Sequence, residues 1–263
     1  MKKLFNKKTD IVAENTANQE QLTDYNVYVM NKKEKILSVI GGFLIGFVAC
    51  YLYFNSMIVG TIIGLFCGYK AIGIYRNMKK NKRLKELRIQ FRDMLESLSN
   101  SYTVGMTASR AFSSAYEDMK LEHGEKAYIT KELNWMCIMH NNGEEIKDLL
   151  LNFADRSGID DVRSFANVFS VAENLAGDRP RIIRETRDMI SERIAVELEI
   201  QTMITGQKNQ LNILAIMPVV MALLTRSFET DSGNITVIII KIVALGIFIF
   251  AYWLGTKIVD IKV

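Results

Sequence analysis

Four long apolar runs constrain this chain more than any other feature of its sequence. A helix needs roughly 20 predominantly apolar residues to cross the hydrocarbon core of a bilayer, and only these runs approach that length. They are Ile36–Phe54, Met57–Tyr75, Leu211–Leu224 and Ile235–Leu254. A polar stretch, Arg76–Gln210, separates the first two apolar runs from the last two. The sequence therefore predicts two transmembrane helical hairpins that flank a helical domain. The third run fits the length requirement least well, since it is short and contains Pro218.

Basic residues at the ends of the runs predict the topology. They flank both open ends of the first hairpin: Lys32, Lys33, Lys35, Arg76, Lys79, Lys80, Lys82 and Arg83. Lysine and arginine are enriched in cytoplasmic loops, so the link Asn55-Ser56 is expected outside. In the second link, Thr225–Asn234, Arg226 is offset by Glu229 and Asp231. The N-terminus, the polar stretch Arg76–Gln210 and the C-terminus are therefore all predicted to be cytoplasmic.

These patterns divide the chain into five predicted segments. The segments are a partly disordered cytoplasmic tail over 1–35, hairpin 1 over 36–75, a helical domain over 76–210, hairpin 2 over 211–254 and a tail over 255–263. The domain over 76–210 holds 21 basic and 21 acidic residues. A nucleic-acid-binding face is normally of one sign, so no nucleic-acid partner is expected.

Apolar residues in the domain recur at helical spacing and predict a cytoplasmic six-helix bundle without strands. The predicted breaks between helices lie at Gly105, Gly124, Gly143, Gly158 and Gly177. Thr107 is expected to cap the second helix, and Asp160 or Asp161 the fifth. Pro180 suits the first turn of the sixth helix, which is expected to continue into the third apolar run.

Glycines recur every four residues in the first hairpin. The positions are Gly42, Gly46, Gly60, Gly64 and Gly68. Small residues at this spacing let membrane helices approach closely, although glycine is common in membrane helices in any case. A packing face is the favoured interpretation, with the first helix or another subunit as its partner.

No motif for catalysis, cofactor binding or metal binding occurs in the chain. It has no phosphate-binding loop, dinucleotide fingerprint, zinc-protease motif or hydrolase elbow, so no enzyme activity and no cofactor are expected. His123 lies beside a glycine break and suggests a solvated turn residue rather than a ligand, and His140 a helix C-terminus. The pairs Glu144-Glu145 and Asp160-Asp161 each open a helix, where acidic residues suit the helix dipole; a catalytic or divalent-ion role is the minor alternative.

Other charged residues and the cysteines leave alternatives open. Arg179, Arg181, Arg184 and Arg187 alternate with acidic residues and predict a solvated, ion-paired face, or else a docking face for an acidic partner. Lys70 and Lys241 lie inside apolar runs near their ends, where a lysine reaches the interface unless it lines a transport path. The three cysteines have no framework spacing, so a disulfide scaffold is not expected, and they are interpreted as small buried hydrophobic residues.

The order of runs and breaks resembles the type II secretion system F-domain family, and within it the Tad (Flp) pilus proteins of the TadB and TadC branches. The resemblance covers roughly residues 88–254. It rests on three stretches, FRDMLESLSNSYTVGMTASRAF from Phe91, GEEIKDLLLNFADRSG from Gly143 and DVRSFANVFSVAENLAGDRPRII from Asp161. The matching positions are Gly105, Gly143, Arg156, Asp161, Gly177 and Pro218, the last at the start of the family's next membrane helix. Asp178-Arg179 departs from the family, which often has a glycine and an apolar residue there.

The resemblance implies a non-enzymatic scaffold, or platform protein, in the bacterial inner membrane. Such proteins bind a hexameric secretion ATPase through the cytoplasmic domain and help to extract pilin subunits from the bilayer. They assemble with themselves or with a paralogous platform protein. A small transporter or channel, with Lys70 or Lys241 on its path, is the alternative from another class. The sequence does not specify the subunit count, the exported substrate or the docking surface.

Overall fold

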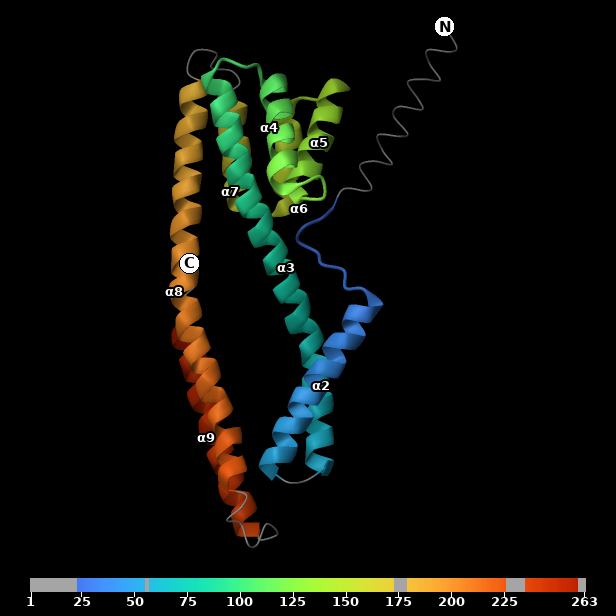
Figure 1. The fold of residues 1–263 in the computed structure, drawn as a ribbon, viewed down its shortest axis with the longest axis vertical. Coiled ribbons are helices and arrows are strands. Elements are labelled where there is room, and N and C mark those ends of the chain that lie inside the picture. The colour runs from blue at the N-terminus through green and yellow to red at the C-terminus, as the bar shows by residue number, and fades with distance from the viewer. Residues whose placement is uncertain (1–22, 55–56, 173–178, 226–234, 260–263) are drawn as a thin grey trace, which may run out of the picture. The chain divides into compact units, whose positions relative to one another are not determined.

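The computed structural model describes residues 23–54, 57–172, 179–225 and 235–259, and the regular structure in these ranges is all helical, without a strand. The prediction of an all-α chain is thus confirmed for this part of the chain. The helices are α2 (Lys32–Phe54), α3 (Met57–Thr103), α4 (Ala108–His123), α5 (Tyr128–Asn141), α6 (Ile146–Ser157), α7 (Asp160–Ala172), α8 (Arg179–Thr225) and α9 (Ile235–Val259) (Figure 1).

Two helices, α3 and α8, are far longer than the others. Each has 47 residues. The sequence pattern treats the second apolar run and the first bundle helix as separate elements, but α3 contains both without a break. α8 confirms the expected continuation from Pro180 into the third run. Pro218 lies inside α8 and not at the start of a helix, so its missing N–H removes one hydrogen bond from the helix interior.

The chain forms two compact units. The first, here called the module, comprises Met1–Tyr28 and Lys80–Asp188, and the second, the apolar unit, comprises Val29–Lys79 and Met189–Val263. α3 and α8 contribute residues to both units, because the unit boundaries fall inside these helices. The predicted boundaries at 76 and 210 are not themselves tested.

Aromatic side chains fill the centre of the module. Phe91 of α3 lies 5.9 Å from Phe165 of α7 and 6.3 Å from Phe153 of α6, measured between ring centroids. Phe169 of α7 in turn contacts Phe112 of α4 at 5.8 Å. All five rings are buried, and such pairs contribute about 0.5–1.5 kcal/mol each beyond burial. The core therefore joins α3, α4, α6 and α7.

The helix breaks lie where the sequence predicts them, with one outside the described residues. The backbone at Gly105 (φ 81°) and Gly143 (φ 101°) is left-handed, a conformation that residues with a Cβ rarely adopt. Gly177 falls outside the described residues. Thr107 is the N-cap residue of α4, but its side chain accepts no capping hydrogen bond from the first turn. The prediction that Asp160 or Asp161 caps the fifth helix is wrong, because both residues lie inside the first turn of α7.

The glycine stripes of the apolar unit face each other across α2 and α3. A Cβ added at Gly42 would lie 2.5 Å from Ala71 Cβ and 3.1 Å from the Cys67 carbonyl oxygen. The other stripe positions, Gly46, Gly60, Gly64 and Gly68, also contact the opposite helix of this pair. The partner of the stripe is therefore the neighbouring helix of the same chain, one of the two partners left open by the sequence.

Two described helices are long and apolar enough to cross a membrane. The apolar segments are Lys32–Tyr53, which is most of α2, and a window within α3. α9 contains a shorter apolar stretch, Gly246–Ile258. α9 also contacts α8, since Tyr252 donates a hydrogen bond of 3.3 Å to Asn212 Oδ1. Because the apolar stretch in α9 is shorter than a membrane span, the predicted second transmembrane hairpin over 211–254 remains a prediction.

Candidate functional site

A largely buried ion pair in the module joins Arg156 to Glu132. Arg156, near the end of α6, donates from Nη1 and Nη2 to the two carboxylate oxygens of Glu132 on α5, at 2.8 and 2.6 Å. The Glu132 side chain is 3% exposed and that of Arg156 15%. Bidentate arginine–carboxylate pairs combine charge with fixed geometry. Arg156, a position of the family pattern, thus joins α5 to α6.

The segment before α2 packs onto this ion pair. Tyr25 is 2% exposed, and its hydroxyl donates to Glu132 Oε1 at 2.8 Å. Its backbone N–H donates to the Arg156 carbonyl at 3.0 Å, and Arg83 of α3 donates to the Tyr25 carbonyl at 2.7 Å. Burial, with the neighbouring Glu132 charge, raises the pKa of the Tyr25 phenol well above its ordinary value. Tyr25 thus packs into the module, and α2 begins at Lys32, within the predicted tail over 1–35, whose boundary stays a prediction.

A second buried ion pair involves the other charged residue of the family pattern. Asp161 in the first turn of α7 is fully buried. Arg88 of α3 donates from Nε to Asp161 Oδ2 at 2.5 Å. An unpaired carboxylate at this depth would be strongly unfavourable, so Arg88 compensates its charge. Both charged pattern residues thus form ion pairs between helices of the module.

The arginines at the start of α8 have local partners. Arg181 pairs with Glu185 at 3.7 Å, and Arg187 with Asp188 at 3.2 Å. Arg184 donates to Thr103 Oγ1 at 2.9 Å. Arg179 donates to the Ala172 carbonyl at 3.4 Å. These contacts favour the solvated, ion-paired interpretation, while the docking alternative remains a prediction for the exposed Arg181 and Arg184.

The carboxylate pairs and His140 have local structural roles. Glu145 is the N-cap residue of α6 and pairs with Lys147. Asp160 and Asp161 begin α7, and Asp161 is engaged by Arg88. His140 lies in the last turn of α5, as expected, and its Nδ1 is 2.9 Å from the Glu144 carbonyl.

The cysteines and Lys70 show no sign of a reactive or transport site. All three cysteines are free, and burial raises the pKa of the Cys137 thiol, which disfavours its reactive thiolate. Lys70 is exposed. It lines neither of two cavities, of about 470 and 510 Å³, in the apolar unit. Lys241 lies in α9, and its side chain is outside the described set.

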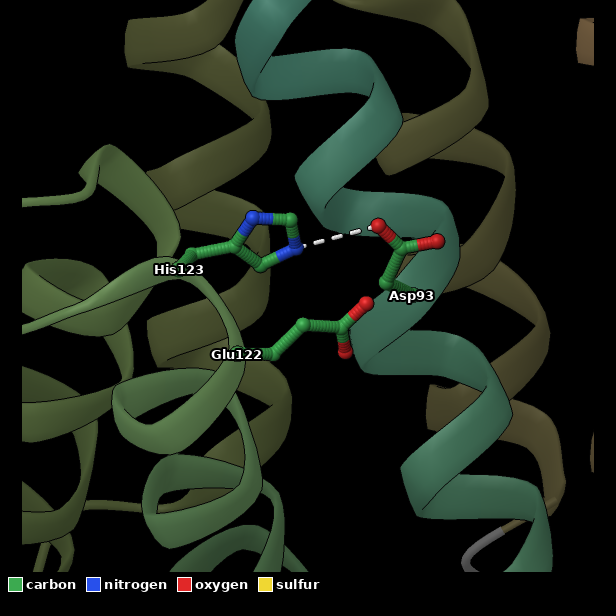
Figure 2. Close-up of side chains that lie close together, drawn as sticks. All are labelled: Asp93, Glu122 and His123. Carbon is green, nitrogen blue, oxygen red and sulfur yellow. Dashed lines mark hydrogen bonds and ion pairs between the residues drawn. The ribbon is translucent and has the colours of Figure 1, made fainter.

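Three side chains that belong to no recognisable sequence motif converge between α3 and α4. His123 Nε2 lies 3.0 Å from Asp93 Oδ2. The Glu122 carboxylate points toward the same place (Figure 2). One potential ligand atom from each residue lies within 4.8 Å of the other two. The expectation of a solvated turn residue at His123 is wrong, because its side chain is only 22% exposed and contacts Asp93.

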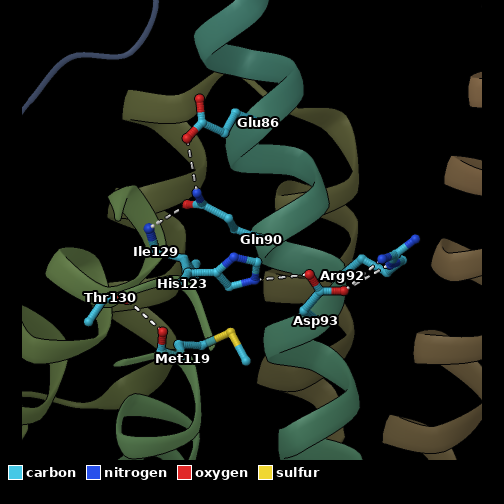
Figure 3. Close-up of polar contacts among 8 residues, drawn as sticks. All are labelled: Glu86, Gln90, Arg92, Asp93, Met119, His123, Ile129 and Thr130. Atoms are coloured by element: carbon cyan, nitrogen blue, oxygen red, sulfur yellow. Dashed lines mark hydrogen bonds and ion pairs between the residues drawn. The ribbon is translucent and has the colours of Figure 1, made fainter. Parts of the chain in front are cut away.

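Neighbouring contacts hold this cluster in place (Figure 3). Arg92 donates from Nε and Nη2 to Asp93 Oδ1 at 3.0 and 2.8 Å. One helical turn earlier, Gln90 Oε1 accepts a hydrogen bond of 3.2 Å from the Ile129 N–H. One turn later, Ser97 donates to Asp118 Oδ2 at 2.5 Å. Asp93 therefore lies on α3 between two hydrogen bonds, one that joins α3 to α5 and one that joins α3 to α4.

No sequence signal pointed to this cluster, because Asp93 and His123 are 30 residues apart on different helices. Comparison with models of known protein families, with curated proteins and with solved structures finds no match for this chain.

Proposed function

We propose that this chain is a non-enzymatic platform protein of the type II secretion system F-domain family. In this proposal it belongs to a type IV-like (Tad/Flp) pilus or type II secretion machine in the bacterial inner membrane. It couples a cytoplasmic hexameric ATPase to the extraction and assembly of pilin subunits. The observation that best supports this proposal is that Arg156 and Asp161, the charged residues of the family pattern, both form buried ion pairs between helices of the module.

Membrane insertion is supported by the exposed apolar surface of α2 and α3. Ile45 is 75% exposed, and Ile58 and Leu65 are 75% and 64% exposed. A helix at the core of a soluble protein would bury such residues, and large exposed apolar patches mark contact surfaces. Lipid covers this surface in the proposed arrangement of two transmembrane hairpins flanking a cytoplasmic six-helix bundle.

Mechanical coupling is supported by the continuity of α3 and α8. Each helix runs from the apolar unit into the module without a loop. A helix of this length extends roughly 70 Å at 1.5 Å per residue. Movement of the module by an ATPase would therefore be transmitted along a helix rather than absorbed in a linker.

Reporter fusions should establish the proposed topology. Fusions at His123 and Val263 should report the cytoplasm, and fusions at Asn55 and Ser232 the outer side, because basic residues concentrate at the opposite ends of the runs. Alkaline phosphatase and a fluorescent protein that matures only in the cytoplasm give opposite readouts at each site. An outer-side signal from His123 would exclude a cytoplasmic module.

The purified full-length protein should show no nucleotide hydrolysis of its own. The reason is that the sequence contains no phosphate-binding loop. The measurement compares phosphate release by the purified protein with release by a mock preparation. Crosslinking in native membranes, followed by mass spectrometry, should attach a separate ATPase to residues of the module. Crosslinks from the Arg181 region would locate the docking face there. Intrinsic turnover above the mock preparation would contradict the proposal, and so would crosslinks to no ATPase at all.

A further inference from the structure

We propose that Asp93, Glu122 and His123 form a binding site for a divalent transition-metal ion of the zinc class. The three side chains supply one imidazole nitrogen and two carboxylates, with their ligand atoms within 4.8 Å of one another. The site lies within the module, on α3 and at the end of α4. It does not depend on the platform function proposed above.

The spacing of the ligand atoms suits one small ion. Two ligands held at about 2.0–2.1 Å in tetrahedral geometry lie roughly 3.3 Å apart. His123 Nε2 and Asp93 Oδ2 are already 3.0 Å apart. A bound ion would replace the hydrogen bond between these two atoms, and the Glu122 carboxylate, whose ligand atom lies within 4.8 Å of them, would move closer to reach it.

The two oxygens of Asp93 have separate roles. Both Arg92 nitrogens that contact this carboxylate donate to Oδ1, so Oδ2 is the oxygen that faces His123 and Glu122. Outer partners of this kind orient a ligand and tune its affinity. The hydrogen bonds from Ile129 to Gln90 and from Ser97 to Asp118 fix α3 against its neighbours on either side. The Asp93 ligand is therefore preorganised on a rigid element.

Glu122 supplies the third ligand from the exposed side. It neighbours His123 in the sequence, and its carboxylate points toward Asp93, where like charges repel and a bound cation would relieve the repulsion. Three protein ligands leave a fourth tetrahedral position for water or for a group from a partner. The imidazole and the small number of oxygens favour zinc-like ions over Ca²⁺, which takes six to eight oxygen ligands.

A bound ion would clamp the C-terminal end of α4 to α3. Because the ligands come together only in the folded module, binding stabilises the folded state by mass action. The predicted consequence is a rise in the unfolding temperature of the module when the ion is added.

The test uses the full-length protein in detergent, purified without a histidine tag and stripped with a chelator. Co²⁺ is titrated while its visible absorption is followed, and Zn²⁺ is then added as competitor. We expect one Co²⁺ per chain with the intense absorption of low-coordinate cobalt, displaced by Zn²⁺, and a higher unfolding temperature. Glu122→Gln and His123→Gln should each lose at least about tenfold in affinity, the smaller loss seen even for outer-shell partners of metal ligands.

His140→Gln is the matched control, because His140 is the second of the two histidines in the chain and lies outside the cluster. It should bind Co²⁺ like the unmodified protein. Glu122→Gln alters an exposed side chain, so it keeps the test valid if His123→Gln weakens the fold. Equal binding by the unmodified protein and both cluster variants would overturn the proposal. So would the absence of saturable binding at one ion per chain.

Discussion

Arg156→Ala is expected to destabilise the module by about 3–5 kcal/mol, the usual cost of removing one partner from a buried ion pair. Glu132, whose side chain is 3% exposed, would lose both arginine hydrogen bonds. The Tyr25 hydroxyl would still donate to Glu132 Oε1. The loss should appear as a lower unfolding midpoint of the full-length protein in detergent.

Arg163→Ala is the control for this experiment. Arg163 pairs with Asp155 at 2.7 Å, but both side chains are more than half exposed. Exposed pairs contribute at most about 1 kcal/mol, so this variant should stay close to the unmodified protein. The double variant Arg156→Met with Glu132→Leu should recover much of the lost stability, because it removes the buried charge as well as its partner. If Arg156→Ala and Arg163→Ala have equal effects, the ion pair does not hold the module together.

Gly42→Leu is expected to separate α2 from α3. Its Cβ alone would lie 2.5 Å from Ala71 Cβ and 3.2 Å from Gly68 Cα, so the side chain would meet backbone as well as side chain. Overpacking of this kind typically costs about 1–3 kcal/mol. Contacts between packed membrane helices contribute only roughly 0.6–2 kcal/mol each, so this cost is enough to open the hairpin. The midpoint of unfolding by sodium dodecyl sulfate measures the loss.

The adjacent glycine provides a closely matched control. A Cβ at Gly41 meets nothing within 4 Å, so Gly41→Leu adds the same side chain at nearly the same depth without a clash. Gly64→Leu and Gly73→Leu form a second pair on α3, because a Cβ added at Gly64 would lie 3.1 Å from the Phe43 ring and one added at Gly73 would meet nothing within 4 Å. Each clashing variant should unfold earlier than its control. Equal midpoints within both pairs would mean that the glycines reflect composition rather than packing.

The sequence by itself predicted the glycine breaks between helices in the described part of the module. Breaks at Gly105 and Gly143 were predictable because positive φ is a local property that glycine alone meets without strain. The apolar spacing in α4, α6 and α7 was readable for the same reason, since helical periodicity is local. Local signals did not reveal that α3 continues through the basic stretch after Tyr75, because lysine and arginine are good helix formers and no breaking residue interrupts them.

Only the tertiary structure decided which charges meet. Arg156 pairs with Glu132 across 24 residues and Arg88 with Asp161 across 73, while Tyr25 reaches Glu132 across 107. The pairing of Asp93 with His123 likewise depends on α4 folding back against α3. Periodicity assigns each residue to a face of its own helix, but the angle and register at which two helices pack select the partner on the other helix. The buried ion pairs and the proposed metal site are therefore properties of the packed module.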